Sequence, residues 1–453
     1  MSKPSIPKGT RDFQADEMLR REFIFETIRS VFRLYGYQPI ETPAMEHLST
    51  LLGKYGEEGD RLIFRILNSG DFLSGVSDRE LLEREPGRLS SKICEKGLRY
   101  DLTVPFARFV VQHRNKLVFP FRRYQIQPVW RADLPQKGGY REFYQCDADV
   151  IGSDSLLNEY ELVRIVEDVF SRLDLKVAVN INNRKILSGF AEYIGEEDRL
   201  TDITVAIDKL EKTGYDAVYA ELREKGISAE AINKLKPVLR LQGDTVRKLN
   251  ELEILLAGSD SGMQGIAEMK TLFSMIEGSG LRSRIVFDLS LARGLNYYTG
   301  TIIEVKSEDM AMGSICGGGR YDNLTGIFGL EGVSGVGISF GADRIYDVML
   351  QLGLFEKRIP ASTRVLVINF GEKEQPYALE IANRLRNSGI STELYPDPVR
   401  LGKQFTYAGS RGIPYVIIAG EEEIGKGECT LKVMETGEQK RLALEDIGSH
   451  ITA

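Results

Sequence analysis

The sequence predicts an α+β protein with three parts: a strand-rich domain, a helical insertion and a C-terminal α/β domain. Alternating side chains around residues 125–130 and 140–151, with a polar loop between them, predict an antiparallel hairpin. Residues 200–280 are rich in Glu, Lys, Leu and Ala, which favours helices. After residue 360, short apolar strands alternate with helices, which is typical of an α/β domain.

The predicted domain boundaries follow these changes of pattern along 453 residues, a length that fits about two to four domains. The strand-rich domain is expected in two pieces, residues 1–180 and 285–355. Residues 181–284 are the expected insertion, and residues 360–453 form the separate C-terminal domain.

The elements of the first part start with an amphipathic helix over residues 16–35, because apolar residues recur there at helical spacing and Gly36 can end it. Residues 37–43 form an extended run with two prolines, which cannot donate within a central strand. We therefore expect an edge strand or an interface there. Residues 155–172 predict another helix after the hairpin.

The elements after residue 284 return to strands and glycines and end in a helix predicted over residues 342–352. Strands of the C-terminal domain are expected at residues 365–368, 392–395 and 415–418, with helices at residues 378–387 and 403–410. This alternation predicts a largely parallel sheet.

Composition excludes several classes of protein. The four cysteines lie far apart, so neither a disulfide framework nor a Cys-x-x-Cys metal site is expected. The N-terminus lacks the apolar core of a signal peptide, and no run of about 18 apolar residues predicts a membrane span. We expect a cytoplasmic protein with reduced thiols.

Charge is distributed unevenly along the chain, although the net charge is −7. Between Arg114 and Arg141, seven basic residues accompany a single acidic one, Asp133, and aromatic residues are interleaved. A local basic segment of this kind suits an anionic ligand. A solvated charged face is the alternative.

The returning strand of the hairpin carries the richest set of candidate residues. Because side chains alternate, one face bears Arg141, Phe143, Gln145, Asp147 and Asp149. A cation, an aromatic platform, an amide and two carboxylates are costly to bury together without a ligand. A solvated sheet face with cross-strand salt bridges is the alternative.

Three further segments contain candidate site residues. Asp101 and Thr103 share a face and suit an ammonium group, or else cap the helix predicted over residues 105–113. In residues 291–300, glycine after Arg293 lets the backbone approach a ligand, and two tyrosines supply phenol donors. Residues 335–345 predict a strand that leads into a helix bearing Arg344.

Residues 314–322 contain three consecutive glycines. They lack the Gly-Lys-Ser/Thr continuation of a P-loop, so a P-loop is excluded. We expect a close-packed turn beside a ligand.

Together these segments resemble the motifs of class II aminoacyl-tRNA synthetases. The Pro43 region is similar to their first motif, Arg131 to Phe143 to the second, and Gly335 to Arg344 to the third. The peptides ARGLNYYTGT and CGGGRYDNL resemble two segments peculiar to histidyl-tRNA synthetases, and LRYDLTVPFAR resembles the branch shared with archaea and eukaryotes. The resemblance covers nearly the whole chain.

The resemblance implies a catalytic domain on a mainly antiparallel sheet and an anticodon-binding C-terminal domain. It implies ATP-dependent activation of L-histidine to histidyl-adenylate, with release of pyrophosphate, and then transfer of histidine to the 3′ end of tRNA(His). It also implies a cytoplasmic homodimer that uses Mg²⁺ carried on ATP and has no dedicated metal site of its own.

The resemblance also implies roles for individual residues. The implied catalytic residues are Arg131 and Arg293, at the α-phosphate. The implied ATP-binding residues are Arg131, Asp133, Phe143 and Arg344, with Phe143 and Arg344 stacked on the two faces of the adenine. The implied histidine-binding residues are Asp101, Thr103 and Gln145 at the amino group, and Asp149, Tyr297 and Tyr298 at the imidazole.

Two positions depart from the family pattern: Asn296 replaces a usual aspartate, and Gly139 stands where a basic residue is common. Two alternative functions would require other sequence features. A regulatory relative that assists ATP phosphoribosyltransferase would usually lack the C-terminal domain and parts of the site. A module that senses uncharged tRNA would be accompanied by a kinase-like segment.

Overall fold

The computed structural model describes residues 3–133, 139–292, 297–355 and 362–451. The chain divides into two compact units, Met1–Leu354 and Phe355–Ala453. Across the described residues, no helix is both long enough and apolar enough to cross a membrane.

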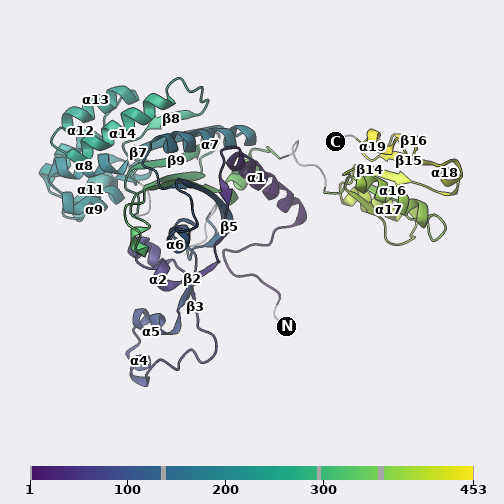
Figure 1. Cartoon of the computed structure of the whole chain (residues 1–453), viewed down its shortest axis with the longest axis horizontal. Coiled ribbons are helices and arrows are strands. Elements are labelled where there is room, and N and C mark those ends of the chain that lie inside the picture. The colour runs from purple at the N-terminus through teal and green to yellow at the C-terminus, as the bar shows by residue number, and fades with distance from the viewer. Residues whose placement is uncertain (1–2, 134–138, 293–296, 356–361, 452–453) are drawn as a thin grey trace. The chain divides into compact units, whose positions relative to one another are not determined.

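An eight-stranded sheet forms the centre of the first unit (Figure 1). Its strands, in spatial order, are β1 (Gln38–Pro39), β5 (Phe121–Trp130), β6 (Glu142–Ile151), β11 (Gly335–Gly341), β10 (Cys316–Tyr321), β9 (Thr301–Ser307), β7 (Val177–Asn183) and β8 (Arg284–Phe287). The pairings between neighbours are antiparallel except at the two edges, β1–β5 and β7–β8. The expected mainly antiparallel sheet is confirmed, and the proline-containing run lies at its edge.

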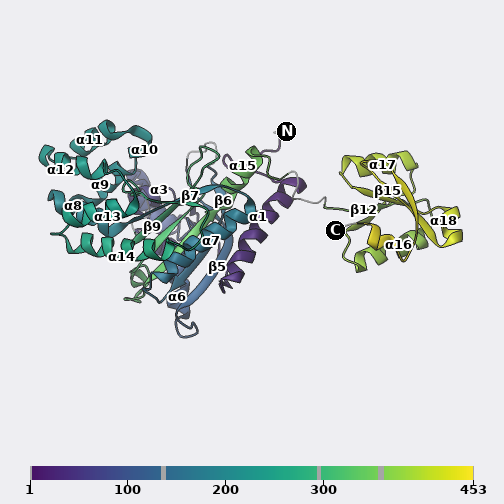
Figure 2. The same cartoon turned by 90° about the horizontal axis from the view of Figure 1, so that it is seen from above.

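Helices cover one face of this sheet. They are α1 (Ala15–Leu34), α7 (Leu157–Leu173) and α15 (Ala342–Gln351), which lie alongside the strands in Figure 2. Phe32 of α1 is fully buried and its ring lies 5.7 Å from that of Tyr124 and 5.9 Å from that of Phe340. Because side chains alternate along strands, the neighbouring residues of β5, β6 and β11 point to the opposite face.

The opposite face meets α6 (Thr103–His113) and a small three-stranded sheet. That sheet contains β2 (Met45–His47), β4 (Lys96–Leu98) and β3 (Arg65–Ile66), with α2 (Leu48–Leu51), α3 (Gly56–Arg61), α4 (Asp78–Glu83) and α5 (Pro86–Ile93) nearby in the chain. Figure 1 shows α4 and α5 extending away from the large sheet beyond β3.

Helices fill the chain between β7 and β8, as the composition of residues 200–280 predicts. They are α8 (Arg184–Ile194), η1 (Glu197–Arg199), α9 (Leu200–Ile207), α10 (Leu210–Thr213), α11 (Tyr215–Glu224), α12 (Ala229–Leu239), α13 (Thr245–Leu255) and α14 (Asp260–Ile276). Gly189 and Gly262 let α8 and α14 approach closely, because a Cβ on Gly189 would lie 2.7 Å from the Cα of Gly262.

The three consecutive glycines form part of strand β10, so the expected turn is wrong; the next short helix is η2 (Gly326–Phe328). A Cβ on Gly318 would collide with the carbonyl oxygen of Gly337 on β11, and one on Gly319 with that of Thr301. The glycines are needed because neighbouring strands pack closely against this one.

The C-terminal unit contains a five-stranded sheet in the order β13 (Thr392–Leu394), β12 (Val365–Val367), β14 (Tyr415–Ile418), β15 (Glu428–Val433) and β16 (Gln439–Ala443). Its helices are α16 (Gln375–Asn387), α17 (Leu401–Ser410), α18 (Glu421–Lys426) and α19 (Ile447–His450). The first three strands are parallel, as expected, but β15 and β16 are antiparallel. The prediction of a largely parallel sheet is therefore correct only for the first three strands, because an antiparallel C-terminal hairpin completes the sheet.

Candidate active site

A pocket of about 380 Å³ opens on the face of the large sheet opposite α1 and α7. This volume lies in the range of small-molecule sites. Nine residues that the sequence singled out line it: Asp101, Thr103, Arg131, Asp133, Phe143, Gln145, Tyr297, Tyr298 and Arg344. The fold thus brings together segments more than 200 positions apart.

The other two candidate site residues are Asp149 and Arg293. Asp149 is buried at 2% exposure and is not among the residues that line the pocket. Arg293, with its neighbour Asn296, lies outside the described residues, as does most of the loop that ends at Gly139.

Asp101 caps a helix, one of the two roles that the sequence left open, and it also lies at the pocket. Its Oδ1 accepts hydrogen bonds from the backbone N–H of Val104 at 3.1 Å and from the Tyr55 hydroxyl at 3.0 Å. Its Oδ2 accepts one from the Tyr297 hydroxyl at 3.3 Å. The carboxylate caps α6 and also lines the pocket. Burial raises the pKa of its carboxyl, which the Val104 N–H and nearby Arg131 oppose.

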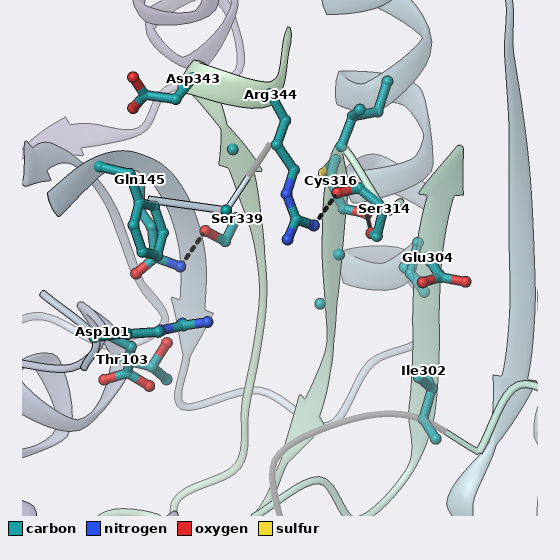
Figure 3. Close-up of a pocket in the computed structure, with 18 of the residues that line it drawn as sticks. Asp101, Thr103, Gln145, Ile302, Glu304, Ser314, Cys316, Ser339, Asp343 and Arg344 are labelled. Atoms are coloured by element: carbon teal, nitrogen blue, oxygen red, sulfur yellow. Dashed lines mark hydrogen bonds between the residues drawn. The ribbon is translucent and has the colours of Figure 1, made fainter. Parts of the chain in front are cut away.

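Two guanidinium groups enter the pocket from different segments. The Nε of Arg131 donates to the carbonyl oxygen of Tyr100 at 3.1 Å, and its Cζ lies 5.2 Å from the ring centroid of Phe143. The Nη1 of Arg344 donates to the carbonyl oxygen of Ser314 at 2.7 Å, and its side chain extends into the pocket in Figure 3. Such an arrangement suits a phosphate beside a flat ring.

Gln145 lines the pocket with its side-chain amide (Figure 3). Its Nε2 donates to the hydroxyl of Ser339 at 2.9 Å, the dashed line at the left of Figure 3. Its Oε1 is buried and has no hydrogen-bond partner within the described part of the chain. A buried acceptor without a partner favours a ligand that carries hydrogen-bond donors.

Buried charges lie beneath the pocket. The Nη2 of Arg123 lies 2.8 Å from Asp149 Oδ2 and 3.8 Å from Asp147 Oδ2, and the Tyr321 hydroxyl donates to Asp149 Oδ1 at 2.6 Å. Burial is the main cause that raises the pKa of Asp147 to about 7, and Arg123 partly opposes it. Asp149 also contributes to the raised pKa of Tyr298, after burial, so these two groups interact electrostatically.

The N-terminal segment that contains Gly9 and Arg11 contacts two of the elements that line the pocket. Arg11 and Arg21 both form ion pairs with Asp343, at 2.7 Å for Arg11 Nη2, and Asp343 lines the pocket. Asp343 Oδ2 also accepts the backbone N–H of Tyr144 at 2.8 Å. The carbonyl oxygen of Gly9 accepts the N–H of Arg141 at 2.9 Å. The start of α15 and the strand bearing Phe143 are therefore tied to one segment.

Sequence reasoning missed Arg123, Ser339, Asp343 and Arg11. Arg123 pairs with Asp149 in the β5–β6 register, so an arginine inside a buried strand opposite an aspartate was the signal. Ser339 and Asp343 lie in the segment that resembles the third motif, but the sequence assigned neither residue a role. Nothing in the local pattern around Arg11 indicated a contact 332 positions away.

Models of two protein families match this chain. A family model for histidyl-tRNA synthetase matches residues 9–78 and 95–345, and one for an anticodon binding domain matches residues 364–453. The stretch left out of the first match, residues 79–94, contains most of α4 and α5.

Individual proteins are similar over nearly their full length. The histidine–tRNA ligase of Bacteroides fragilis (strain YCH46) is 58% identical, over 100% of this chain and 99% of that protein. That of Porphyromonas gingivalis is 59% identical, over 98% and 97%. The crystal structure of histidyl-tRNA synthetase from Nostoc sp. PCC 7120 aligns with a TM-score of 0.84 and 32% identity, over 100% of this chain and 99% of that one.

Proposed function

The chain belongs to the histidyl-tRNA synthetase family, and from this premise we propose how the pocket residues divide the reaction. The enzyme uses ATP to activate L-histidine as histidyl-adenylate, with release of pyrophosphate, and then transfers histidine to the 3′ end of tRNA(His). The observation that most directly supports the division of roles is that nine candidate residues, drawn from the sets for ATP and for histidine, line one pocket.

Histidine would lie at the end of the pocket that contains Asp101. Asp101, Thr103 and Gln145 would bind its ammonium group, which the buried acceptors of Asp101 and Gln145 support. Asp149, Tyr297 and Tyr298 would face the imidazole. Such a site would form hydrogen bonds with both imidazole nitrogens. An analogue that lacks these nitrogens would leave buried polar groups of the site without partners, so the site rejects it without editing.

ATP would occupy the other end of the pocket. Phe143 and Arg344 would stack on the two faces of the adenine, and Asp133 would contribute to ATP binding. Arg131 would contact the α-phosphate, with Arg293 at the same phosphate. The attack joins a carboxylate to a phosphate, so two anions approach each other, and fixed guanidiniums would offset the charge that grows on the phosphoryl oxygens.

Mg²⁺ would enter with ATP as part of the substrate and would add positive charge at the phosphates. Among the described residues, no group of three or more His, Cys, Asp or Glu side chains forms a candidate metal site.

The second step requires tRNA(His). The C-terminal domain would contact anticodon bases, which an anticodon loop can splay outward for recognition. Residues 134–139 would contact the acceptor end, although Gly139 supplies no positive charge there.

The active form would be a cytoplasmic homodimer. The edge strand β1 and the preceding helix α1 would contribute to the interface through the segment that reaches Pro43. Val118 is 83% exposed and Phe119 38%, on the connection that leads into β5, the neighbour of β1. Exposed apolar side chains near an unpaired sheet edge favour association. Size-exclusion chromatography with light scattering would give twice the 50.9 kDa chain mass if this holds.

The test of the whole reaction is charging of tRNA(His) with labelled L-histidine in the presence of ATP and Mg²⁺. We expect label in the tRNA that depends on ATP and on an intact 3′ end. A folded enzyme that forms histidyl-adenylate but leaves tRNA(His) uncharged would contradict the second step alone.

A further inference from the structure

The side-chain amide of Gln145 has a defined direction in the pocket. Its Nε2 donates to Ser339 Oγ at 2.9 Å, while its Oε1 is buried without a partner in the described structure. In Figure 3 the amide oxygen lies on the side of Asp101 and Thr103. The orientation matters because an ammonium group only donates, so the oxygen and not the NH₂ must face it.

A glutamine and a serine alone do not fix this orientation. A hydroxyl both donates and accepts, so Ser339 can equally donate to the amide oxygen and leave the amide NH₂ directed at the pocket. That reversed pair would repel an ammonium group. A third group is needed that makes Ser339 the acceptor of the pair.

Asp147 supplies that group. It lies directly opposite Ser339 in the antiparallel β6–β11 register and is 1% exposed. Side chains of directly opposed residues lie within contact distance. An ionised carboxylate only accepts, so it receives the Ser339 hydrogen, and Ser339 must then accept from Gln145. The hydrogen bond from Ser339 also lowers the pKa of Asp147, against the larger effect of burial.

The groups around Asp147 act on its charge in both directions. Arg123 on β5 lies 3.8 Å away and favours the ionised form. Gln125 stands opposite Asp147 in the β5–β6 register, but its amide N–H groups donate to Thr42 and Gln127. Asp149 on the same strand and Asp101 before α6 oppose ionisation. Asp149 is closer to Arg123 and accepts the Tyr321 hydroxyl, so Asp147 is the carboxyl that is ionised above about pH 7 and gains a proton below it.

We propose that Asp147 and Ser339 are positioning residues for the α-amino group of histidine, and that they act by fixing the amide of Gln145 with its oxygen toward the ammonium. The inference rests on the proposed function, because it assumes that the ammonium binds beside Asp101. It assigns a role in amino-group recognition to two residues that do not themselves contact that group.

The test compares ligands with and without the amino group. Calorimetric titrations would use L-histidine, L-histidinol and imidazolepropionate, which lacks the amino group, with wild type, Ser339→Ala and Asp147→Asn. We expect Ser339→Ala to weaken binding of the two amino-bearing ligands on the order of tenfold and to leave imidazolepropionate unchanged. Asp147→Asn should weaken the same two ligands by about 3–10-fold, since an asparagine no longer forces Ser339 to donate.

Ser307→Ala is the matched control. It removes another buried hydroxyl from the same sheet, on β9, at a position that does not line the pocket. All three affinities should remain as in wild type. Equal weakening of amino-bearing and des-amino ligands by the Ser339 or Asp147 variant would indicate general loosening of the site and would overturn the inference.

A double-mutant comparison gives a second, independent test. In a Gln145→Ala background, Ser339→Ala should not weaken L-histidine binding further, because its effect passes through Gln145. Additive effects would overturn the inference, as would unchanged binding in either single variant. If wild type binds imidazolepropionate too weakly to titrate, this comparison decides alone. Wild-type enzyme that binds no histidine would contradict the proposed function instead.

Discussion

The Nε of Arg131 donates a hydrogen bond of 3.1 Å to the carbonyl oxygen of Tyr100, the residue that precedes Asp101. The Cζ of Arg131 also lies 4.2 Å from the centroid of the Tyr100 ring. The side chain proposed at the α-phosphate is thus held by the backbone next to the residue proposed at the histidine ammonium. Positioning of this kind places a guanidinium where charge develops before either substrate arrives.

Replacement of Arg131 tests this arrangement. Arg131→Ala should lower the rate of adenylate formation by about 100–1000-fold, the usual effect of losing one fixed group that stabilises developing charge. Arg131→Lys should form adenylate at a rate between those of wild type and Arg131→Ala, because an ammonium keeps the charge but not the planar fork of the guanidinium. Single-turnover adenylation measures both. Arg79→Ala, which removes an exposed ion pair on α4, is the control and should match wild type.

Replacement of Arg11 is expected to weaken ATP binding more than histidine binding. Arg11→Ala removes one of the two cations on Asp343, the residue before Arg344, while Arg21 remains. We expect the KM for ATP to rise about 3–10-fold with the KM for histidine unchanged, since a partly buried ion pair is lost. Steady-state exchange kinetics measure both constants, with Arg29→Ala on α1 as the control. An equal rise in both constants would argue against a local effect on the ATP end.

Histidine binding should weaken in acid. Burial raises the pKa of Asp147 to about 7, so the carboxyl gains a proton as the pH falls through 7 and no longer forces Ser339 to donate. If the protonated form binds poorly, the Kd for L-histidine rises about tenfold between pH 8 and pH 6.

The imidazole of the ligand titrates in the same range, so the measurement is the ratio of the wild-type Kd to that of Asp147→Asn at each pH. That ratio should increase toward low pH, because the variant cannot titrate at this position. Parallel pH profiles for the two proteins would contradict a role for the charge of Asp147.

Gly337 should tolerate no side chain. A Cβ there would collide with the Oδ1 of Asp149, a buried carboxylate whose Oδ2 pairs with Arg123. Gly337→Ala should destabilise the protein by about 1–3 kcal/mol, as overpacking in a core commonly does, and should displace Asp149. Thermal unfolding and histidine titration measure the two effects. Gly75→Ala, where the new methyl group meets nothing within 4 Å, should change neither.

The sequence predicted the local elements and the pocket residues well, because alternation and motif spacing are local signals. The face bearing Phe143 and Gln145 lines the pocket as alternation requires. Asp147 and Asp149 share that face but lie deeper, beside Arg123, which depends on the pairing of two strands. The glycines of β10 were mistaken for a turn because only the packed sheet reveals which carbonyl oxygens a Cβ would meet.

The central claim is that this pocket activates histidine. Its most direct test is ATP–pyrophosphate exchange with each of the twenty amino acids, using wild type and Arg293→Ala. We predict exchange that depends on L-histidine in the wild type and falls steeply in a folded Arg293→Ala variant. A well-folded wild-type enzyme without histidine-dependent exchange would contradict the account, and a fully active Arg293→Ala variant would contradict the role proposed for that arginine.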